Sequence, residues 1–272
     1  MKNSASRTAE RVAERRAAHQ LLDSPLVFHD PLAVRILGPG AKDRLMHERS
    51  PLDRYFRAAF AARSRFAEDC LRTAVELRAI SRYVILGAGL DTFAYRNPFP
   101  GLRVFEVDHP ATQAAKRERL AQAGIDVPPS VTFVPIDFST TRLDDVLQLD
   151  GPAFFSWLGV VPYLELAAIR ATLRFVVSRA KNSELVFDFG PPPESLSWKA
   201  RLVFRSMAKR VAAAGEPFKT FFEPDDLMRV MRESGFSTAE DFGPAELNRL
   251  YFAGRSDNVR IGEMLHMCRG IV

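Results

Sequence analysis

Cysteine is scarce in this chain of 272 residues. Its two cysteines, Cys70 and Cys268, lie far apart, and no Cys-x-x-Cys pair occurs. A disulfide framework or a zinc site needs more thiols at closer spacing. We therefore expect reduced thiols, as in a cytoplasmic protein, and no bound metal.

Long hydrophobic runs are also lacking. The longest apolar stretch, 153–164, is interrupted by Ser156, Gly159 and Pro162, and it is too short to span a bilayer. The first residues are polar and charged, and no apolar core of a signal peptide follows them. We expect no contact with a membrane.

No charge of one sign dominates the chain. Lys and Arg number 38 and Asp and Glu 33, so the formal net charge is +5. Cations and acids are interspersed, as in 10–16, and such a dispersed surplus fits solubility or a small anionic substrate better than a phosphate backbone. We expect a small-molecule or peptide partner and no nucleic acid, while the oligomeric state stays open.

What the chain does contain, after residue 82, is a series of short apolar segments that alternate with helix-like stretches. The apolar segments are 83–86, 102–107, 131–136, 153–158 and 184–189. The helix-like stretches between them are 110–123, 141–148 and 165–180. Near-continuous apolar strands that alternate with helices predict an α/β fold, with a parallel sheet covered on both faces.

The remaining segments look mainly helical. Residues 4 to about 80 have helical spacing, including a second long stretch at 51–77. We therefore expect residues 1–80 to form a helical lid region and 81–272 a core with a helical insertion near 195–232. The segment 247–270 could add one or two strands.

Polar residues follow each of the first three predicted strands. The first ends in Gly87-Ala88-Gly89, a turn that lets the backbone approach a ligand closely. Asp108 ends the second and is placed to bind ribose hydroxyls. Asp137 and Phe138 end the third and suit the amine and the face of an adenine. Each alone could be a turn or a helix cap; together they predict an adenosyl cofactor.

A nicotinamide dinucleotide is the competing cofactor, and it would make the chain an oxidoreductase. Its turn favours a third glycine, in the pattern Gly-x-Gly-x-x-Gly. Thr92 stands at that position, and Asp91 beside the turn would repel a pyrophosphate. The turn therefore favours S-adenosylmethionine.

Several motifs around these strand ends occur together in one known family. They are the segment 86–92, Tyr95-Arg96, the segment 105–110 and Lys116, with further matches at Asp30-Pro31, 62–66, 135–138, 157–158 and 162–164. This pattern resembles the leucine carboxyl methyltransferase family of class I S-adenosylmethionine-dependent methyltransferases. The resemblance covers most of the chain. It implies a Rossmann-like, mostly parallel seven-stranded sheet and an O-methyltransferase activity.

The resemblance also implies roles for individual residues. Arg63 matches an arginine that binds the carboxylate of the cofactor, and Arg16 matches a basic residue that also reaches it. Gly87 lies under the methionine part, Asp108 binds the ribose, and Asp137 and Phe138 frame the adenine. The expected cofactor site is completed by Ala88, Gly89, His109 and Trp157. The chain departs from the family after Trp157, where many relatives carry an acid and this sequence has none.

The methyl acceptor is less strongly indicated. The chain has five histidines, and none forms an obvious catalytic triad. A carboxylate is ionised at neutral pH and needs no general base, whereas a hydroxyl would benefit from one, such as His19 or His29. We therefore expect a carboxylate acceptor, with a hydroxyl as the alternative, positioned by Arg65 and Tyr163. Bacterial relatives that methylate polyketide carboxyl groups make a secondary metabolite a plausible acceptor.

The apolar side chains of 195–222 could line a pocket for a bulky apolar substrate. They are Trp198, Phe204, Met207, Phe218, Phe221 and Phe222. Ordinary helix packing is the simpler explanation for them.

Overall fold

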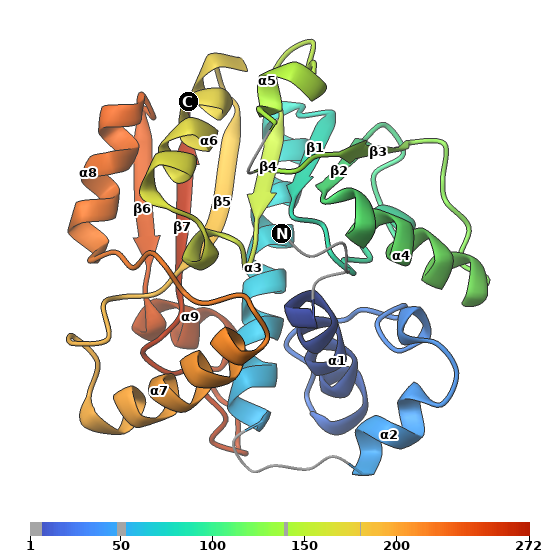
Figure 1. The fold of residues 1–272 in the computed structure, drawn as a ribbon, viewed down its shortest axis with the longest axis vertical. Helices are drawn as coiled ribbons and strands as arrows, with labels where there is room; N and C mark the ends of the chain where they lie inside the picture. Colours follow the sequence, from blue (N-terminus) through green and yellow to red (C-terminus); the bar gives the residue numbers. More distant parts are fainter. Residues whose placement is uncertain (1–6, 48–52, 139–140, 180) are drawn as a thin grey trace.

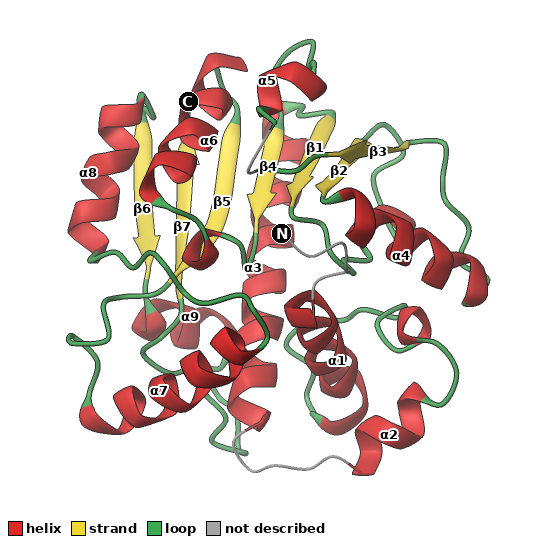
Figure 2. Cartoon of the chain, in the orientation of Figure 1, coloured by secondary structure: helices red, strands yellow, loops and turns green. Residues whose placement is uncertain are grey.

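A seven-stranded sheet forms the centre of the protein (Figures 1 and 2). The computed structural model describes residues 7–47, 53–138, 141–179 and 181–272. The strands are β1 (Arg82–Leu86), β2 (Arg103–Asp108), β3 (Val131–Pro135), β4 (Phe154–Trp157), β5 (Glu184–Phe189), β6 (Thr238–Phe242) and β7 (His266–Ile271). Their order is β3-β2-β1-β4-β5-β7-β6; β1 to β5 run parallel, and β7 pairs antiparallel with β5 and β6. The Rossmann-like, mostly parallel sheet is therefore confirmed.

Helices surround the sheet. They are α1 (Arg7–Leu22), α2 (Ala41–His47), α3 (Asp53–Arg78), α4 (Pro110–Gln122), α5 (Leu143–Val146), α6 (Leu166–Arg179), α7 (Trp198–Ala213), α8 (Pro224–Ser234) and α9 (Pro244–Tyr251). Short 3-10 helices lie at Arg35–Leu37, Phe93–Tyr95 and Val161–Tyr163. Residues 4–6, 51–52 and 180 of the expected helices lie outside the described residues.

The end of the chain contributes one strand, β7, within the one or two that we expected there, while residues 247–251 belong to α9. Helix α9 begins at Pro244 and carries buried Leu247, so its apolar side packs on the sheet. Helix α8 ends at Ser234, where Gly235 adopts a φ of 107° in the left-handed region, and β6 begins soon after it.

Both faces of the sheet are buried. Successive side chains along a strand point to opposite faces, so they alternate between two apolar clusters. Val84 and Leu86 of β1 pack in the cluster that contains α6 and α8. Tyr83 and Ile85 pack in the cluster that contains α3 and α9. The long helix α3, which we placed in the N-terminal region, therefore packs directly on the sheet.

The strands β1 to β5 point toward the part of the molecule that contains α1, α7 and the first turns of α3 (Figure 1). A third apolar cluster, which includes Ala13, Ile36, Leu90 and Leu120, joins α1 to the turn after β1 and to α4. The chain passes from β1 to β2 and β3 on one side and returns to β4 on the other. Sheets of this kind bind ligands where the order reverses.

Membrane insertion of a helix has no support in this fold. Within the described residues, no helix combines the length and the apolar character that crossing a bilayer requires.

Candidate active site at the carboxyl ends of the strands

The turn after β1 approaches its neighbours closely. Gly87 has a φ of 73°, in the left-handed region, and a Cβ there would overlap the side chain of Val160. A Cβ on Gly89 would lie 3.2 Å from the Cβ of Ala9, so α1 rests directly on the turn. Ala88 between them is buried. A larger residue at Gly87 would strain the backbone and displace the loop after β4.

Asp108 connects the ends of β1 and β2. The backbone N–H groups of Gly89 and His109 donate hydrogen bonds to its two carboxylate oxygens, at 2.5 and 2.6 Å. Burial raises the pKa of Asp108 above its ordinary value, in spite of these two hydrogen bonds. Each carboxylate oxygen can accept a second hydrogen bond, so Asp108 keeps acceptor capacity for ribose hydroxyls.

The raised pKa of Asp108 gives a pH-dependence prediction. Affinity for S-adenosylhomocysteine should fall as the pH decreases from 7 toward 4, and the fall should begin at a higher pH than an ordinary aspartate would give, because the protonated carboxyl is a poorer acceptor. Isothermal calorimetry across this range measures it. The variant Asp108→Asn should bind weakly at every pH, whereas His109→Asn, which keeps a helix-capping side chain, should retain the dependence. The prediction is contradicted if the affinity of Asp108→Asn for S-adenosylhomocysteine depends on pH in the same way as that of the wild type.

Three further predicted residues lie near the ends of β2 and β3. His109 caps α4, because its Nδ1 accepts a hydrogen bond from the N–H of Ala111. Its Nε2 lies 3.9 Å from Oδ2 of Asp137. Phe138 is partly buried against the sheet. The structure thus brings Asp108, His109, Asp137 and Phe138 to one edge, and their contacts with the cofactor remain predictions.

Arg16 lies behind the turn rather than in front of it. Its Nε lies 2.9 Å from Oδ2 of Asp30, and its Nη2 donates to the carbonyl of Leu90. The hydroxyl of Thr92 also donates to Asp30, at 2.7 Å. The guanidinium is buried and engaged, so we now propose that Arg16 supports the turn instead of contacting the cofactor.

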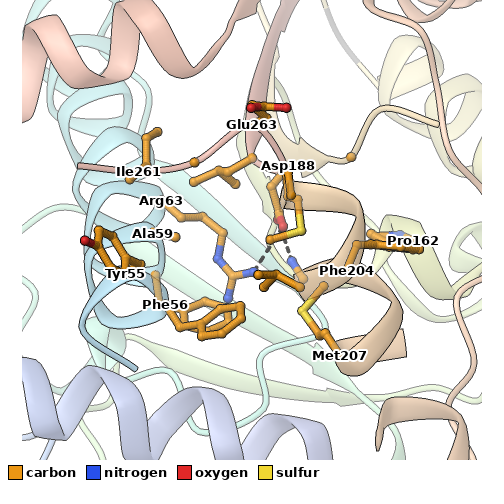
Figure 3. Close-up of a pocket in the computed structure, with 18 of the residues that line it drawn as sticks. Tyr55, Phe56, Ala59, Arg63, Pro162, Asp188, Phe204, Met207, Ile261 and Glu263 are labelled. Atoms are coloured by element: carbon orange, nitrogen blue, oxygen red, sulfur yellow. Dashed lines mark hydrogen bonds and ion pairs between the residues drawn. The ribbon is translucent and has the colours of Figure 1, made fainter. Parts of the chain in front are cut away.

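Arg63 and Asp188 form the polar centre of the site (Figure 3). Nη1 of Arg63, on α3, donates to Oδ2 of Asp188, at the end of β5, over 3.0 Å. The other oxygen of Asp188 accepts from the N–H of Gly159, at 2.5 Å. Arg63 is only 6% exposed, and its Nε has no hydrogen-bond partner among the described residues. Arg63 also lines the adjoining cavity, where its guanidinium would suit an anionic group such as the carboxylate of the cofactor.

A cavity of about 640 Å³ opens beside this pair. Its walls come from α1, α3, α7, the loops after β4 and β5, and the segment 260–265. Most lining side chains are apolar, including Phe60, Phe189, Val203 and Ile261. The volume is in the range of small-molecule sites, so an apolar chamber adjoins the ends of β4 and β5.

The other predicted residues divide between this cavity and places outside it. Tyr163 lines the cavity, and burial raises the pKa of its hydroxyl to about 12, which makes it a hydrogen-bond donor at neutral pH. Arg65 does not face the cavity: its side chain is 47% exposed and pairs with Asp69, one helical turn away. Trp157 is fully buried against Phe187 in the core and does not line the cavity.

Asp188 was missed by the sequence analysis. It ends a buried strand, which is the same signal that identified Asp108 and Asp137. The expected acid after β4 is absent, and Asp188 from the neighbouring strand binds the N–H of Gly159 in that loop. Gly159 has a φ of 69°, and a Cβ there would lie 2.8 Å from Nη1 of Arg63. This glycine therefore allows the arginine to reach the strand ends.

Similar proteins share this architecture. A DUF574 family protein from Streptomyces avermitilis MA-4680 has a TM-score of 0.56 and 14% identity, over 98% of this chain and 97% of its own. The magnesium protoporphyrin IX methyltransferase (ChlM) from Synechocystis PCC 6803, solved with bound SAH, has a TM-score of 0.52 and 14% identity, over 87% and 91%. At this identity, the likeness shows the fold.

Sequence relatives identify the class. The "Putative S-adenosyl-L-methionine-dependent methyltransferase YktD" of Bacillus subtilis (strain 168) is 31% identical over 99% of both chains. A protein of the same description from Mycobacteroides abscessus is 32% identical over 70% of this chain and 66% of its own. Together with the fold, they define this chain as an S-adenosylmethionine-dependent methyltransferase.

The family follows from residues 9–177, which match the model of the leucine carboxyl methyltransferase family. The chain belongs to that family. Its cofactor is S-adenosylmethionine, and the nicotinamide alternative is wrong.

Proposed function

We propose that the enzyme methylates a carboxylate oxygen of a small-molecule or peptide acceptor that enters the cavity beside Arg63. The observation that carries this proposal is the chemistry of the cavity lining. Cationic side chains there outnumber acidic ones, and no histidine occurs among the described lining residues. Such a lining suits an acceptor that is already anionic, since a carboxylate needs no general base.

The two acidic side chains of the described lining, Asp188 and Glu263, are already engaged by other groups, so they do not neutralise the remaining cations of the cavity. Asp188 is paired with Arg63, and a carboxylate oxygen of Glu263 accepts from the N–H of Ser197. Tyr163, as a neutral donor, is placed to orient an acceptor oxygen. Arg65 has no part in this proposal because it pairs with Asp69 on the surface.

Residues at the strand ends would hold the cofactor. Asp108 is our choice for the ribose, Asp137 and Phe138 for the adenine, and Arg63 for the carboxylate. When bound, S-adenosylmethionine supplies a methyl group that its sulfonium has already activated. The protein contributes mainly by orienting the acceptor and excluding water.

The test compares acceptors that differ in one group. The enzyme is incubated with methyl-labelled S-adenosylmethionine and either decanoic acid, decanol or 4-octylphenol. We expect label in the acid alone, and we expect mild base to release it as methanol, because methyl esters hydrolyse and methyl ethers do not. Base-stable label in the alcohol or the phenol would overturn the proposal in favour of hydroxyl methylation.

A further inference from the structure

A second set of arginines lies in the cavity, on elements outside the sheet. Arg15 of α1 lines it, and its guanidinium carbon lies 4.9 Å from the ring centroid of Phe56 and 5.7 Å from that of Phe60. The guanidinium of Arg63 lies 4.8 Å from the same Phe60 ring. Arg15 is therefore close to the site, but it is separate from the Arg63–Asp188 pair.

Two more cations converge on Arg15. Arg11 of α1 and Arg210 of α7 also line the cavity. Burial lowers the pKa of Arg15, the carboxylate of Asp53 opposes this change, and the positive charges of Arg210 and Arg11 add to it. We call Arg11, Arg15 and Arg210 the cation cluster.

The cation cluster has little negative charge to balance it. Asp53 lies 3.6 Å from Nη2 of Arg15, a longer separation than the 3.0 Å of the Arg63–Asp188 pair. Among the described residues, no carboxylate forms an ion pair with Arg11 or Arg210. Arg15 is partly buried, whereas Arg11 and Arg210 are exposed. Solvent therefore weakens the repulsion among the three cations, and a bound anion relieves what remains of it.

An aromatic wall adjoins the cation cluster. The ring centroid of Tyr163 lies 5.2 Å from that of Phe218, and Phe204 lies 5.8 Å from Phe218 and 5.5 Å from Phe221. Phe204 and Met207 of α7 lie across the cavity from Tyr55 and Ala59 of α3 (Figure 3). The cavity thus has room for an apolar body between two helices.

From this arrangement we infer that the acceptor is an amphipathic organic acid. Its carboxylate binds the cation cluster, and its apolar body lies against the aromatic wall of Tyr163, Phe204, Phe218 and Phe221. This inference rests on the proposed function, since it names the substrate class of that same cavity. The two groups of cations then have different ligands: Arg63 binds the carboxylate of the cofactor, and the cation cluster binds the carboxylate of the acceptor.

The test measures binding without catalysis. The probe is 11-(dansylamino)undecanoic acid, and its methyl ester is the neutral counterpart; fluorescence titration gives both dissociation constants. We expect the wild-type enzyme to bind the acid about tenfold more tightly than the ester, the effect of charge-assisted hydrogen bonds. The double variant Arg15→Gln/Arg210→Gln should lose this preference.

The matched control is Arg205→Gln. Arg205 is an exposed arginine of α7 that does not line the cavity, so this variant removes a charge from the same helix and should retain the preference. S-adenosylhomocysteine affinity should stay unchanged in all variants, which shows that they fold. Equal binding of acid and ester by the wild type, or equal preferences in the double variant and the control, would overturn the inference.

The two experiments distinguish a failure of this inference from a failure of the proposed function. If the acid binds through the cation cluster but no methyl ester forms, the carboxylate activity fails and the binding site stands. If methyl esters of acids form equally well in the double variant, the activity stands and the cation cluster does not select the acceptor.

Discussion

Replacing Lys116 by methionine is expected to lower the free energy of unfolding by about 3–5 kcal/mol, the cost of leaving one partner of a buried ion pair alone. Nζ of Lys116, on α4, lies 2.8 Å from Oε2 of Glu106, on β2. Lys116 is 1% exposed and Glu106 is fully buried. The hydroxyl of Tyr95 donates to the same oxygen, at 2.9 Å. Burial raises the pKa of Glu106, so without Lys116 this carboxylate has to be protonated.

Denaturant unfolding at pH 7 measures this loss. The control is Arg117→Met, which removes a charge from the next, exposed position of α4 and should cost less than about 1 kcal/mol. The double variant Glu106→Gln/Lys116→Met removes both charges and should recover part of the stability. A loss in Lys116→Met no greater than in Arg117→Met would show that the pair contributes nothing.

The variant Arg63→Met is expected to weaken S-adenosylhomocysteine binding by about 100-fold, which corresponds to about 2.7 kcal/mol, in the range of a hydrogen-bonded charged contact. It removes the guanidinium that lines the cavity, and it frees Asp188, whose negative charge would then repel the carboxylate of the ligand. Both effects act in the same direction.

Arg65→Met is the matched control for this prediction. Arg65 is on the same helix, two residues further along, and pairs with Asp69 on the surface. Its replacement should leave the affinity within about twofold of the wild-type value, in line with the small contribution of exposed pairs. Calorimetry of both variants decides the assignment, and an equal loss in both would falsify the role that we give to Arg63.

The contrast between these two arginines shows what the sequence can and cannot predict. Strand ends are marked by a change from apolar to polar residues, so Gly87, Asp108 and Asp137 could be located from sequence. The direction of a side chain on α3 depends on the rotation of the helix about its axis, which packing on the sheet decides. Two arginines that are two positions apart therefore point in different directions, and the sequence alone did not separate them.

Other residues depended on contacts between distant segments. The expectation that Arg16 reaches the cofactor came from the family resemblance, whereas its burial against Asp30 and Leu90 arises only when α1 folds over the strands. Arg15 and Arg210 are almost two hundred residues apart, and only the tertiary fold brings them into one cavity. Asp188, by contrast, carried a visible signal at the end of an apolar strand.

The helix α1 has a consequence for how this protein can change through evolution. One side of it supports the cofactor turn through Arg16, and the other side faces the cavity through Thr8, Arg11 and Arg15. The cation cluster comes from α1 and α7, and much of the remaining cavity wall comes from α3, whereas the residues that we propose for the cofactor are Arg63 and the strand ends. Under this proposal, mutations of cavity-lining residues other than Arg63 can alter acceptor choice while the cofactor site stays intact, so new specificities can arise on an unchanged methyl-transfer core.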